Sequence, residues 1–373
     1  KKFLHYFNFC FWLGDSCVIQ AQHISQENEF EALMQKYDRI FANPDITQGL
    51  EKYNAQNGSF TDVDYASIQR TNWPPLVHIN RISDFVFAYT NPENRYYQNE
   101  DLYNKIEKGL EYWHERNPWC HNWWYNQIAE PQALGVLLIQ MRTGKKQLPH
   151  ELESKLLERI KDGGNPAKWT GANRTDIALH WIYRACLSKD TETLEFALEN
   201  VYNPVVYTTK EDFSMTTATF NTETIDIGGY GDEILKGVTQ VAMYTRGTRF
   251  AIPQEKLDLI SKFMRKTYYP TIRGKYMLFD VMGRSVSRPG VPDKSHTALF
   301  AQRMEILDTA HAQEFREIIS RLKEEKPANY ASSLNIHIIS AEIIHYMYVQ
   351  NTPSMCDWFP IVPPVVNMAM EKT

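Results

Sequence analysis

The chain has 373 residues, of which 43% are hydrophobic and 23% are charged, a composition typical of a folded globular protein rather than a disordered one. Its net charge of −5 argues against a general nucleic-acid binder, so we expect no nucleic-acid partner. Any anionic substrate must therefore be met by a local group of cations. Aromatic residues reach 13%, with 9 Trp and 21 Tyr, side chains that can fill a core or stack on sugar rings.

The first 22 residues have the pattern of a secretory signal peptide. Lys1 and Lys2 supply positive charge, residues 3–13 are mostly apolar, and Ala21 is a candidate cleavage residue. Because Asp15 is unusual in such a segment, a buried N-terminal helix is the alternative. The apolar run is too short to span a bilayer. We therefore predict a secreted or periplasmic protein with no membrane span.

Removal of residues 1–22 would leave three cysteines at wide spacings: Cys120, Cys186 and Cys356. Their odd number and spacing predict neither a disulfide framework nor a zinc site. His114 and His121 flank Cys120 without matching a known ligand spacing. We expect no metal and no cofactor.

Between residues 23 and 330 the apolar residues recur mainly at helical spacing. The stripes are Phe30–Leu33–Met34–Tyr37–Phe41, Leu102–Ile106–Leu110–Trp113, Leu152–Leu156–Ile160, Ile234–Val238–Val241 and Phe315–Ile318–Ile319–Leu322. Polar breaks containing Gly or Pro separate the stripes, at 91–92, 163–166, 228–229 and 288–290. Repeated helix–loop–helix units predict an all-α domain of helical hairpins arranged as a toroid or solenoid, and the lack of a fixed repeat disfavours a regular solenoid.

The last part of the chain differs in character. Residues 358–365 read Trp-Phe-Pro-Ile-Val-Pro-Pro-Val, a pattern typical of an extended segment. We interpret residues 331–373 as a linker, or as the truncated start of a β domain.

Four stretches within the helical region contain candidate site residues. The first holds Asn122, Trp123 and Trp124. Two adjacent Trp residues cannot share one helix face, so at least one is expected to face a cleft or a loop. They are either a stacking platform for sugar rings or a core anchor beside a helix N-terminus.

The second stretch, residues 169–176, is a Gly-containing turn that leads into a helix. Asn173 there is either an N-cap or an amide that hydrogen-bonds a substrate carboxylate. The third stretch, residues 221–231, places Tyr230 between glycines, where the backbone can approach another group closely. Tyr230 is either a proton-transfer group or an exposed loop tyrosine.

The fourth stretch, residues 280–290, holds Arg284 and Arg288, four residues apart and followed by Pro-Gly. Arginine binds carboxylate or sulfate through two parallel hydrogen bonds. A pair of arginines beside a tyrosine and an asparagine suits an acidic sugar.

Together these stretches resemble polysaccharide lyase family eight, which contains hyaluronate lyase, chondroitin AC lyase and xanthan lyase. The matching segments are NWWYNQIAEPQALG (122–135), TGANRTDIA (170–178), GGYG (228–231) and GKYMLFDVMGRSVSRPG (274–290). Each is weak alone, but four in the family's order are specific. The resemblance implies an incomplete α/α toroid followed by β-sandwich domains. It also implies β-elimination at a uronic acid of an acidic polysaccharide of the hyaluronan or chondroitin type.

The resemblance further implies a role for each matching residue. Asn173 neutralises the substrate carboxylate, Tyr230 acts as base and acid, and Arg284 and Arg288 position the sugar. Trp123 and Trp124 form an aromatic patch, while Asn122 and Arg174 are further substrate-binding candidates. We expect the polysaccharide as partner and a monomeric protein.

The sequence departs from the family in two ways. Where the family has a His nine residues before the Tyr, this chain has Asn221, which cannot carry a proton as His can. The β domains, with a catalytic Glu, are absent from these 373 residues. Both departures keep a second hypothesis open, a glycan-binding relative without catalysis.

A third hypothesis is a glycoside hydrolase on an α/α barrel. That chemistry needs two facing carboxylates. Glu130, Asp226 and Glu233 are the candidates, although no pattern in the sequence pairs them.

Overall fold

The computed structural model describes residues 26–36, 42–206, 220–221, 224–225, 227–283, 285, 288 and 290–323, without the side chains of 26–28, 220–221, 224–225 and 280. The predicted signal segment 1–22 and the predicted linker 331–373 lie outside these residues, as do Tyr37, Phe41 and Asp226. Those assignments stay predictions.

The described part of the chain is built almost entirely of helices, as predicted. The α-helices are α1 (Gln26–Met34), α2 (Thr47–Lys52), α3 (Leu76–Thr90), α4 (Glu100–Arg116), α5 (Glu130–Met141), α6 (His150–Lys161), α7 (Gly171–Ser188), α8 (Thr191–Tyr202), α9 (Asp232–Thr245), α10 (Gln254–Phe263), α11 (Ala298–Leu307) and α12 (Ala312–Leu322). Two short antiparallel hairpins accompany them, β1 (Phe220–Asn221) with β2 (Thr224–Ile225), and β3 (Ile272–Arg273) with β4 (Tyr276–Met277).

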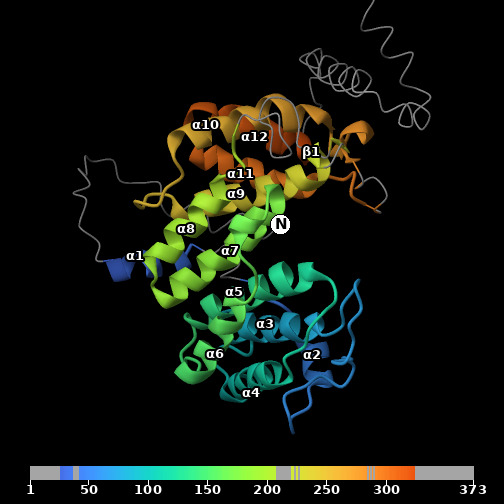
Figure 1. Ribbon diagram of the computed structural model, residues 1–373, viewed down its shortest axis with the longest axis vertical. Helices are drawn as coiled ribbons and strands as arrows, with labels where there is room; N and C mark the ends of the chain where they lie inside the picture. The colour runs from blue at the N-terminus through green and yellow to red at the C-terminus, as the bar shows by residue number, and fades with distance from the viewer. Residues whose placement is uncertain are drawn as a thin grey trace, which may run out of the picture.

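The helices form an open double layer. Alternate helices α3, α5, α7, α9 and α11 pack side by side in that order, and α4, α6, α8 and α12 pack as outer partners against this inner row. Figure 1 shows the two ends of the row far apart, with α3 in the lower part of the molecule and α11 in the upper part. The arrangement is an incomplete α/α toroid of helical hairpins.

The inner and outer helices differ in how much of their surface is buried, and their sequence patterns differ accordingly. The inner helix α5 buries residues on all its sides, and α3 and α7 bury most of theirs. The outer helices α4, α6 and α12 bury one stripe each, and these are the predicted stripes at 102–113, 152–160 and 315–322. A helix that is apolar all round belongs in the interior, whereas a striped helix covers it.

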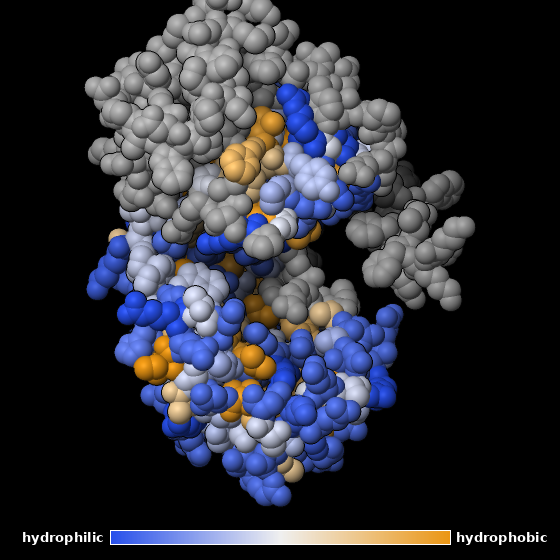
Figure 2. Space-filling model, turned by 90° about the vertical axis from the view of Figure 1, so that its right-hand side faces the viewer, coloured by the Kyte–Doolittle hydropathy of each residue, from blue (hydrophilic) through white to orange (hydrophobic). Residues whose placement is uncertain are grey.

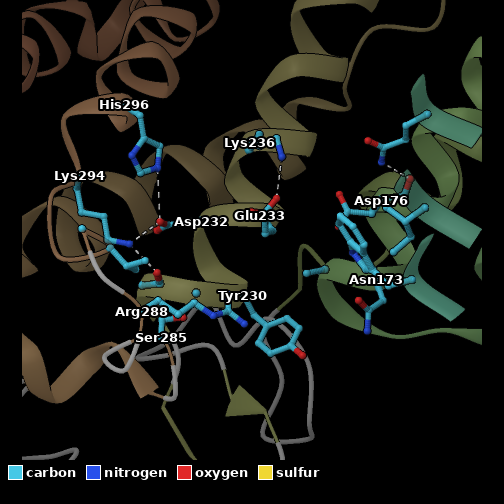
Figure 3. A pocket seen from close by; sticks show the side chains of 18 of the residues that line it. Asn173, Asp176, Tyr230, Asp232, Glu233, Lys236, Ser285, Arg288, Lys294 and His296 are labelled. Atoms are coloured by element: carbon cyan, nitrogen blue, oxygen red, sulfur yellow. Dashed lines mark hydrogen bonds and ion pairs between the residues drawn. The ribbon is translucent and has the colours of Figure 1, made fainter. Parts of the chain in front are cut away.

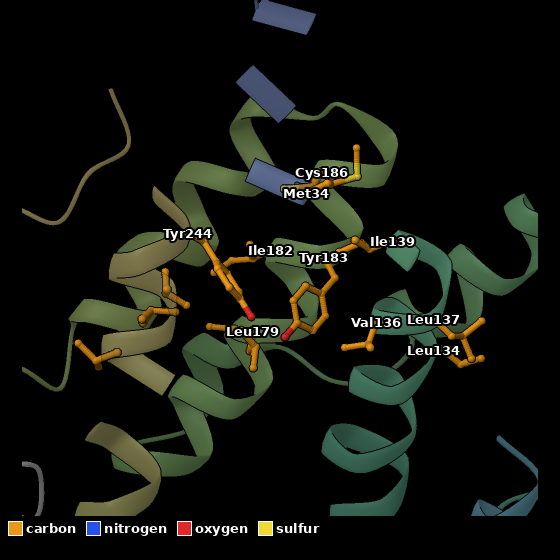
Figure 4. Packing of buried hydrophobic residues seen from close by; sticks show 14 of the residues in the cluster. Met34, Leu134, Val136, Leu137, Ile139, Leu179, Ile182, Tyr183, Cys186 and Tyr244 are labelled. Carbon is orange, nitrogen blue, oxygen red and sulfur yellow. The ribbon is translucent and has the colours of Figure 1, made fainter. Parts of the chain in front are cut away.

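Two glycines set how closely the inner helices approach. A Cβ on Gly135 of α5 would lie 2.7 Å from the Tyr183 ring of α7, within the apolar cluster shown in Figure 4. A Cβ on Gly237 of α9 would lie 2.6 Å from the Thr175 methyl group of α7. Because real Cβ atoms do not approach other atoms so closely, glycine is required at both positions. The second contact brings the N-terminal halves of α7 and α9 together.

One predicted break is wrong. Gly228 and Gly229 do not interrupt the helical path but lie in a π-helical turn, η3 (Ile227–Gly231), that runs directly into α9. A similar π turn, η1 (Tyr125–Ala129), precedes α5. Such turns are frequent at functional sites.

The outer surface in the lower part of the molecule is predominantly hydrophilic, with scattered apolar residues, as Figure 2 shows. Among the helices of the described residues, none is long and apolar enough to cross a membrane. Cys120 and Cys186 are buried and free.

Candidate active site

A cleft of about 1040 Å³ lies where the inner helices begin. Its walls come from the residues before α5, the first turns of α7 and α9, the η3 turn, and the segment that leads to α11 (Figure 3). The predicted site residues found on its lining are Asn122, Trp123, Trp124, Asn173, Tyr230 and Arg288. Segments far apart in sequence therefore meet at this one cleft.

The tandem tryptophans form an aromatic wall. Trp123 and Trp124 remain 37% and 41% exposed, so neither is a core anchor. Trp123 stacks on Trp169, with 4.1 Å between ring centroids and 25° between ring planes. Asn122 orders the pair, because its Oδ1 accepts from the backbone N of Trp124 and its Nδ2 donates to the carbonyl of Arg70. The wall offers flat apolar faces on which sugar rings can stack.

Asn173 lies on the cleft in the first turn of α7. The alternative that it is an N-cap is wrong, since Thr170 occupies the N-cap and Asn173 is the third helical residue. Backbone N–H groups of a first helical turn lack intrahelical partners and point toward the N-terminus. A carboxylate beside Asn173 would meet both this positive end and the amide.

The structure directs Arg174 elsewhere, which corrects its assignment to substrate binding. Its Nε donates to Oδ1 of Asn200 at 2.8 Å, and its Nη1 donates to Oδ1 of Asn203 at 2.6 Å. These bonds join α7 to the end of α8, and Arg174 is not among the residues that line the cleft. Neighbours on a helix point in different directions, so Asn173 and Arg174 cannot serve one face.

Tyr230 is the fourth residue of the η3 turn and is half-buried at the cleft. In the view of Figure 3 it lies between Arg288 and Asn173. Gly228 permits this position, because a Cβ there would overlap the sulfur of Met277 and lie 3.3 Å from Cγ of Met282. The side chain of Asn221 and all of Arg284 lie outside the described residues, although the backbone of Asn221 pairs with Thr224 in the β1–β2 hairpin.

Carboxylates and cations alternate along the same lining, and most are paired. Lys236 Nζ donates to Oε2 of Glu233 at 2.8 Å, and Lys294 Nζ donates to Oδ2 of Asp232 at 2.7 Å. Burial, together with the nearby charge of Glu233, raises the pKa of Asp176 to about 7. Pairing and protonation thus remove much of the negative charge that would otherwise repel an anionic substrate.

Several of these residues were missed by the sequence reasoning: Asp176, Asp232, Lys236, Lys294 and His296. Asp176 and Asp232 lie in or directly after the matching stretches, but a charge beside a turn is ordinarily solvated. Lys294 gives no local signal, since its partner Asp232 lies 62 residues earlier.

Of the carboxylates suggested for a glycoside hydrolase, the two that the structure describes, Glu130 and Glu233, do not face each other across the cleft. Glu130 is buried away from the cleft, where it accepts from Trp113 Nε1 at 3.0 Å and from Arg159 Nη2 at 2.9 Å. Glu233 lines the cleft, and Asp226 lies outside the described residues. Within the described residues, no group of three or more His, Cys, Asp or Glu could hold a metal ion.

Comparisons with known proteins bear on the fold and the family of the chain. Residues 15–324 match the model of the polysaccharide lyase family 8 N-terminal alpha-helical domain. Chondroitinase-AC of Pedobacter heparinus is 38% identical over 276 residues, covering 74% of this chain and 39% of the relative. Hyaluronate lyase HylB of Enterococcus faecalis is 24% identical over 286 residues, covering 68% and 28%. The chain thus spans well under half the length of these curated relatives.

Solved structures give the same result. A chondroitinase AC lyase studied with bound oligosaccharides superposes with a TM-score of 0.76 at 34% identity, covering 82% of this chain and 46% of that one. A Paenibacillus xanthan lyase gives a TM-score of 0.61 at 19% identity, covering 92% and 34%, a likeness of fold alone. With its four ordered motifs, its open α/α toroid and these matches, the chain belongs to polysaccharide lyase family 8.

Proposed function

We propose that this chain is the helical part of a lyase that cleaves a uronic-acid-containing glycosaminoglycan, of the hyaluronan or chondroitin type, by β-elimination. The observation that carries the proposal is the meeting of Asn173, Tyr230 and Arg288 at one cleft beside the Trp123–Trp124 wall. The names of the relatives, a chondroitinase AC and hyaluronate lyases, support the substrate class.

The chemistry demands a base and a stabilised anion. A base removes the C5 proton, the electron pair forms the C4–C5 double bond, and the glycosidic oxygen on C4 leaves with a proton. The C5 proton is weakly acidic, so the negative charge that develops on the adjacent carboxylate must be met by fixed donors. In this proposal the amide of Asn173 and the first-turn N–H groups of α7 supply those donors.

Tyr230 is the proposed proton carrier. It takes the C5 proton as the phenolate and returns a proton to the leaving oxygen as the phenol, so the enzyme ends each cycle unchanged. Arg288, with Arg284, grips the acidic sugar and holds it against Tyr230. The exposed faces of Trp123 and Trp124 bind neighbouring sugar rings and keep the polymer in register.

Direct assay tests the proposal. The full-length protein is incubated with hyaluronan, chondroitin sulfates and xanthan while the ultraviolet absorbance of the unsaturated product is followed. We expect product from hyaluronan or chondroitin at neutral pH. Absence of product from every polymer, across a range of pH and salt, contradicts the proposed lyase.

A binding protein without catalysis is the second candidate, and Asn221 is the observation that favours it. Asn can hydrogen-bond a carboxylate, but it cannot exchange a proton with a reacting sugar. This candidate predicts saturable binding of acidic polysaccharide that weakens as salt rises, without product. An Asn221→His variant that gains elimination activity from an inactive parent supports this candidate, and an active parent excludes it.

A further inference from the structure

A buried ion pair lies directly behind the turn that carries Tyr230. Lys294 is 1% exposed, and its Nζ donates to the carbonyl oxygen of Gly228 at 2.6 Å and to Oδ2 of Asp232 at 2.7 Å. The other carboxylate oxygen of Asp232 accepts from the hydroxyl of Tyr268 at 2.5 Å. Buried charges are tolerated when they are paired and hydrogen-bonded, and this set satisfies both conditions.

The ammonium group of Lys294 holds the turn at both ends. Gly228 and Asp232 stand two residues before and two residues after Tyr230, with η3 ending at Gly231 and α9 beginning at Asp232. One side chain thus bonds both flanks of a single π turn. Because those flanks fix where the Cα of Tyr230 lies, they also fix where its phenol can reach.

Lys294 is held rigidly by its own backbone. Its N donates to the carbonyl of Lys275 at 2.7 Å, and its carbonyl accepts from the N and Oγ1 of Thr297 at 2.9 and 2.7 Å. The carbonyl of Thr297 in turn accepts from the buried hydroxyl of Tyr269 at 2.8 Å. The ammonium group therefore projects from an anchored point rather than from a loose loop.

The segment that carries Lys294 also continues from Arg288. Backbone bonds run from Val291 N to the carbonyl of Arg288 at 3.4 Å and from Asp293 N to the carbonyl of Gly290 at 3.1 Å. Lys294 consequently joins the segment that begins at Arg288 to the turn of Tyr230. The bonds of Lys294 therefore hold Tyr230 and Arg288 relative to each other, although neither residue takes part in those bonds.

We propose that Lys294 is a positioning residue that acts through the Gly228 carbonyl and Asp232 to aim Tyr230 into the cleft. The kinetic consequence rests on the proposed lyase function, whereas the structural consequence does not. A shift of the base by about 1 Å can cost on the order of 100-fold in rate. Loss of Lys294 should therefore lower kcat, while the Trp123–Trp124 wall preserves KM.

Four variants separate positioning from stability. Lys294→Met keeps the alkyl chain but leaves the buried Asp232 carboxylate without its ammonium partner, so it also costs stability. The double variant Lys294→Met with Asp232→Asn removes both charges and avoids that cost. Lys294→Arg restores donors for both partners. Lys256→Met is the matched control, because Lys256 Nζ also donates to a backbone carbonyl, that of Val205 at 2.7 Å, away from the cleft.

The experiment measures hydrogen exchange of residues 227–232 and steady-state kinetics on chondroitin. We expect Lys294→Met and the double variant to exchange about tenfold faster at these residues and to lose roughly 10- to 100-fold in kcat, with KM changed less than about twofold. Lys294→Arg should recover most of the rate, and the control should match the parent.

Two results would overturn the inference: unchanged exchange of residues 227–232, or a double variant that regains full kcat along with its stability. If the parent makes no product from any polymer, the proposed function fails by itself. The exchange data then decide the inference, since faster exchange limited to these residues supports the role of Lys294 in holding the turn.

Discussion

The region of α2 to α6 and the region around the η3 turn bury different kinds of residue. In the first, Trp73, Trp113 and the neutral ring of His78 pack together, with 5.4 Å between the centroids of His78 and Trp113. In the second, the ammonium group of Lys294 and the carboxylate of Asp232 are buried at the lining of the cleft. One region is held mainly by aromatic packing, and the other by directed bonds between charges.

The difference follows from what each region must hold. Aromatic packing is strong but tolerates small shifts, whereas hydrogen bonds between charges fix atoms at set distances and angles. Directed bonds suit the segment that aims Tyr230 and Arg288 into the cleft. The aromatic region contacts the Trp123–Trp124 wall through Tyr125, whose ring lies against both Trp73 and Trp124.

The largest expected effect comes from Tyr230→Phe, which removes one oxygen from the cleft. We expect kcat on chondroitin to fall at least about 1000-fold, or roughly 4 kcal/mol of transition-state stabilisation. Thermal stability and oligosaccharide affinity should stay near the parent values, because the ring remains.

The control for that change is Tyr97→Phe, which removes the same atom from an exposed tyrosine between α3 and α4. It should leave kcat unchanged. Comparable rates for Tyr230→Phe and Tyr97→Phe would remove Tyr230 from the mechanism.

The aromatic region has an exception that tests the comparison, the buried ion pair of Glu130 with Arg159. Glu130→Gln leaves a largely buried guanidinium without its carboxylate, so we expect a loss of about 3–5 kcal/mol in the free energy of unfolding. The rate per folded molecule should not change. Chemical denaturation monitored by circular dichroism measures the first quantity.

Glu151→Gln on α6 is the matched control, since its ion pair with Lys155 is exposed. It should leave the free energy of unfolding nearly unchanged, because an exposed ion pair is screened by solvent. If both variants lose equally little, the Glu130 pair contributes no more than a surface pair.

Acid should weaken the aromatic region through His78. Its Nε2 donates to the Gly109 carbonyl and its Nδ1 accepts from Tyr65, and burial lowers its pKa to about 4. The unfolded chain gains this proton near pH 6.5, so stability falls as pH drops from 6.5 to 4, by up to about 3 kcal/mol. Denaturation at several pH values should show this slope in the parent and a smaller one in His78→Gln. Equal slopes would contradict the assignment.

The sequence predicted the features that depend on near neighbours. The stripe of Leu102, Ile106 and Leu110 identified α4, because burial on a helix repeats within a few residues. The motifs predicted which residues meet at the cleft through family resemblance, since no local pattern joins Asn173 to Tyr230. Asn173 and Tyr230 lie far apart in sequence, and the packing of Gly237 against Thr175 brings the helices beside them together.

Features that depend on distant partners could not be predicted. Lys294 pairs with a residue 62 positions away, and Arg174 turns from the cleft because Asn200 and Asn203 receive its guanidinium. The glycines before Tyr230 were predicted to be a break, but they lie in a π turn, where Gly228 packs against Met277 and Met282. In each case the position of the residue depends on a partner that only the folded chain brings near.

The smallest expected effect concerns Asp176 in the cleft, whose contribution to stability changes with pH in the direction opposite to that of His78. Burial and Glu233 raise the pKa of Asp176 to about 7, so between pH 4 and 7 the unfolded chain loses this proton first and stability falls as pH rises. Because the side chain is only partly buried where it lines the cleft, we expect Asp176→Asn to gain only about 1 kcal/mol at pH 8 and nothing at pH 4. In a Glu233→Gln background the gain from Asp176→Asn should be smaller, because the repulsion that raises the pKa of Asp176 is then already removed. A gain that is equal at both pH values would mean that Asp176 stays ionised, and the cleft would then meet the proposed anionic substrate with one more negative charge.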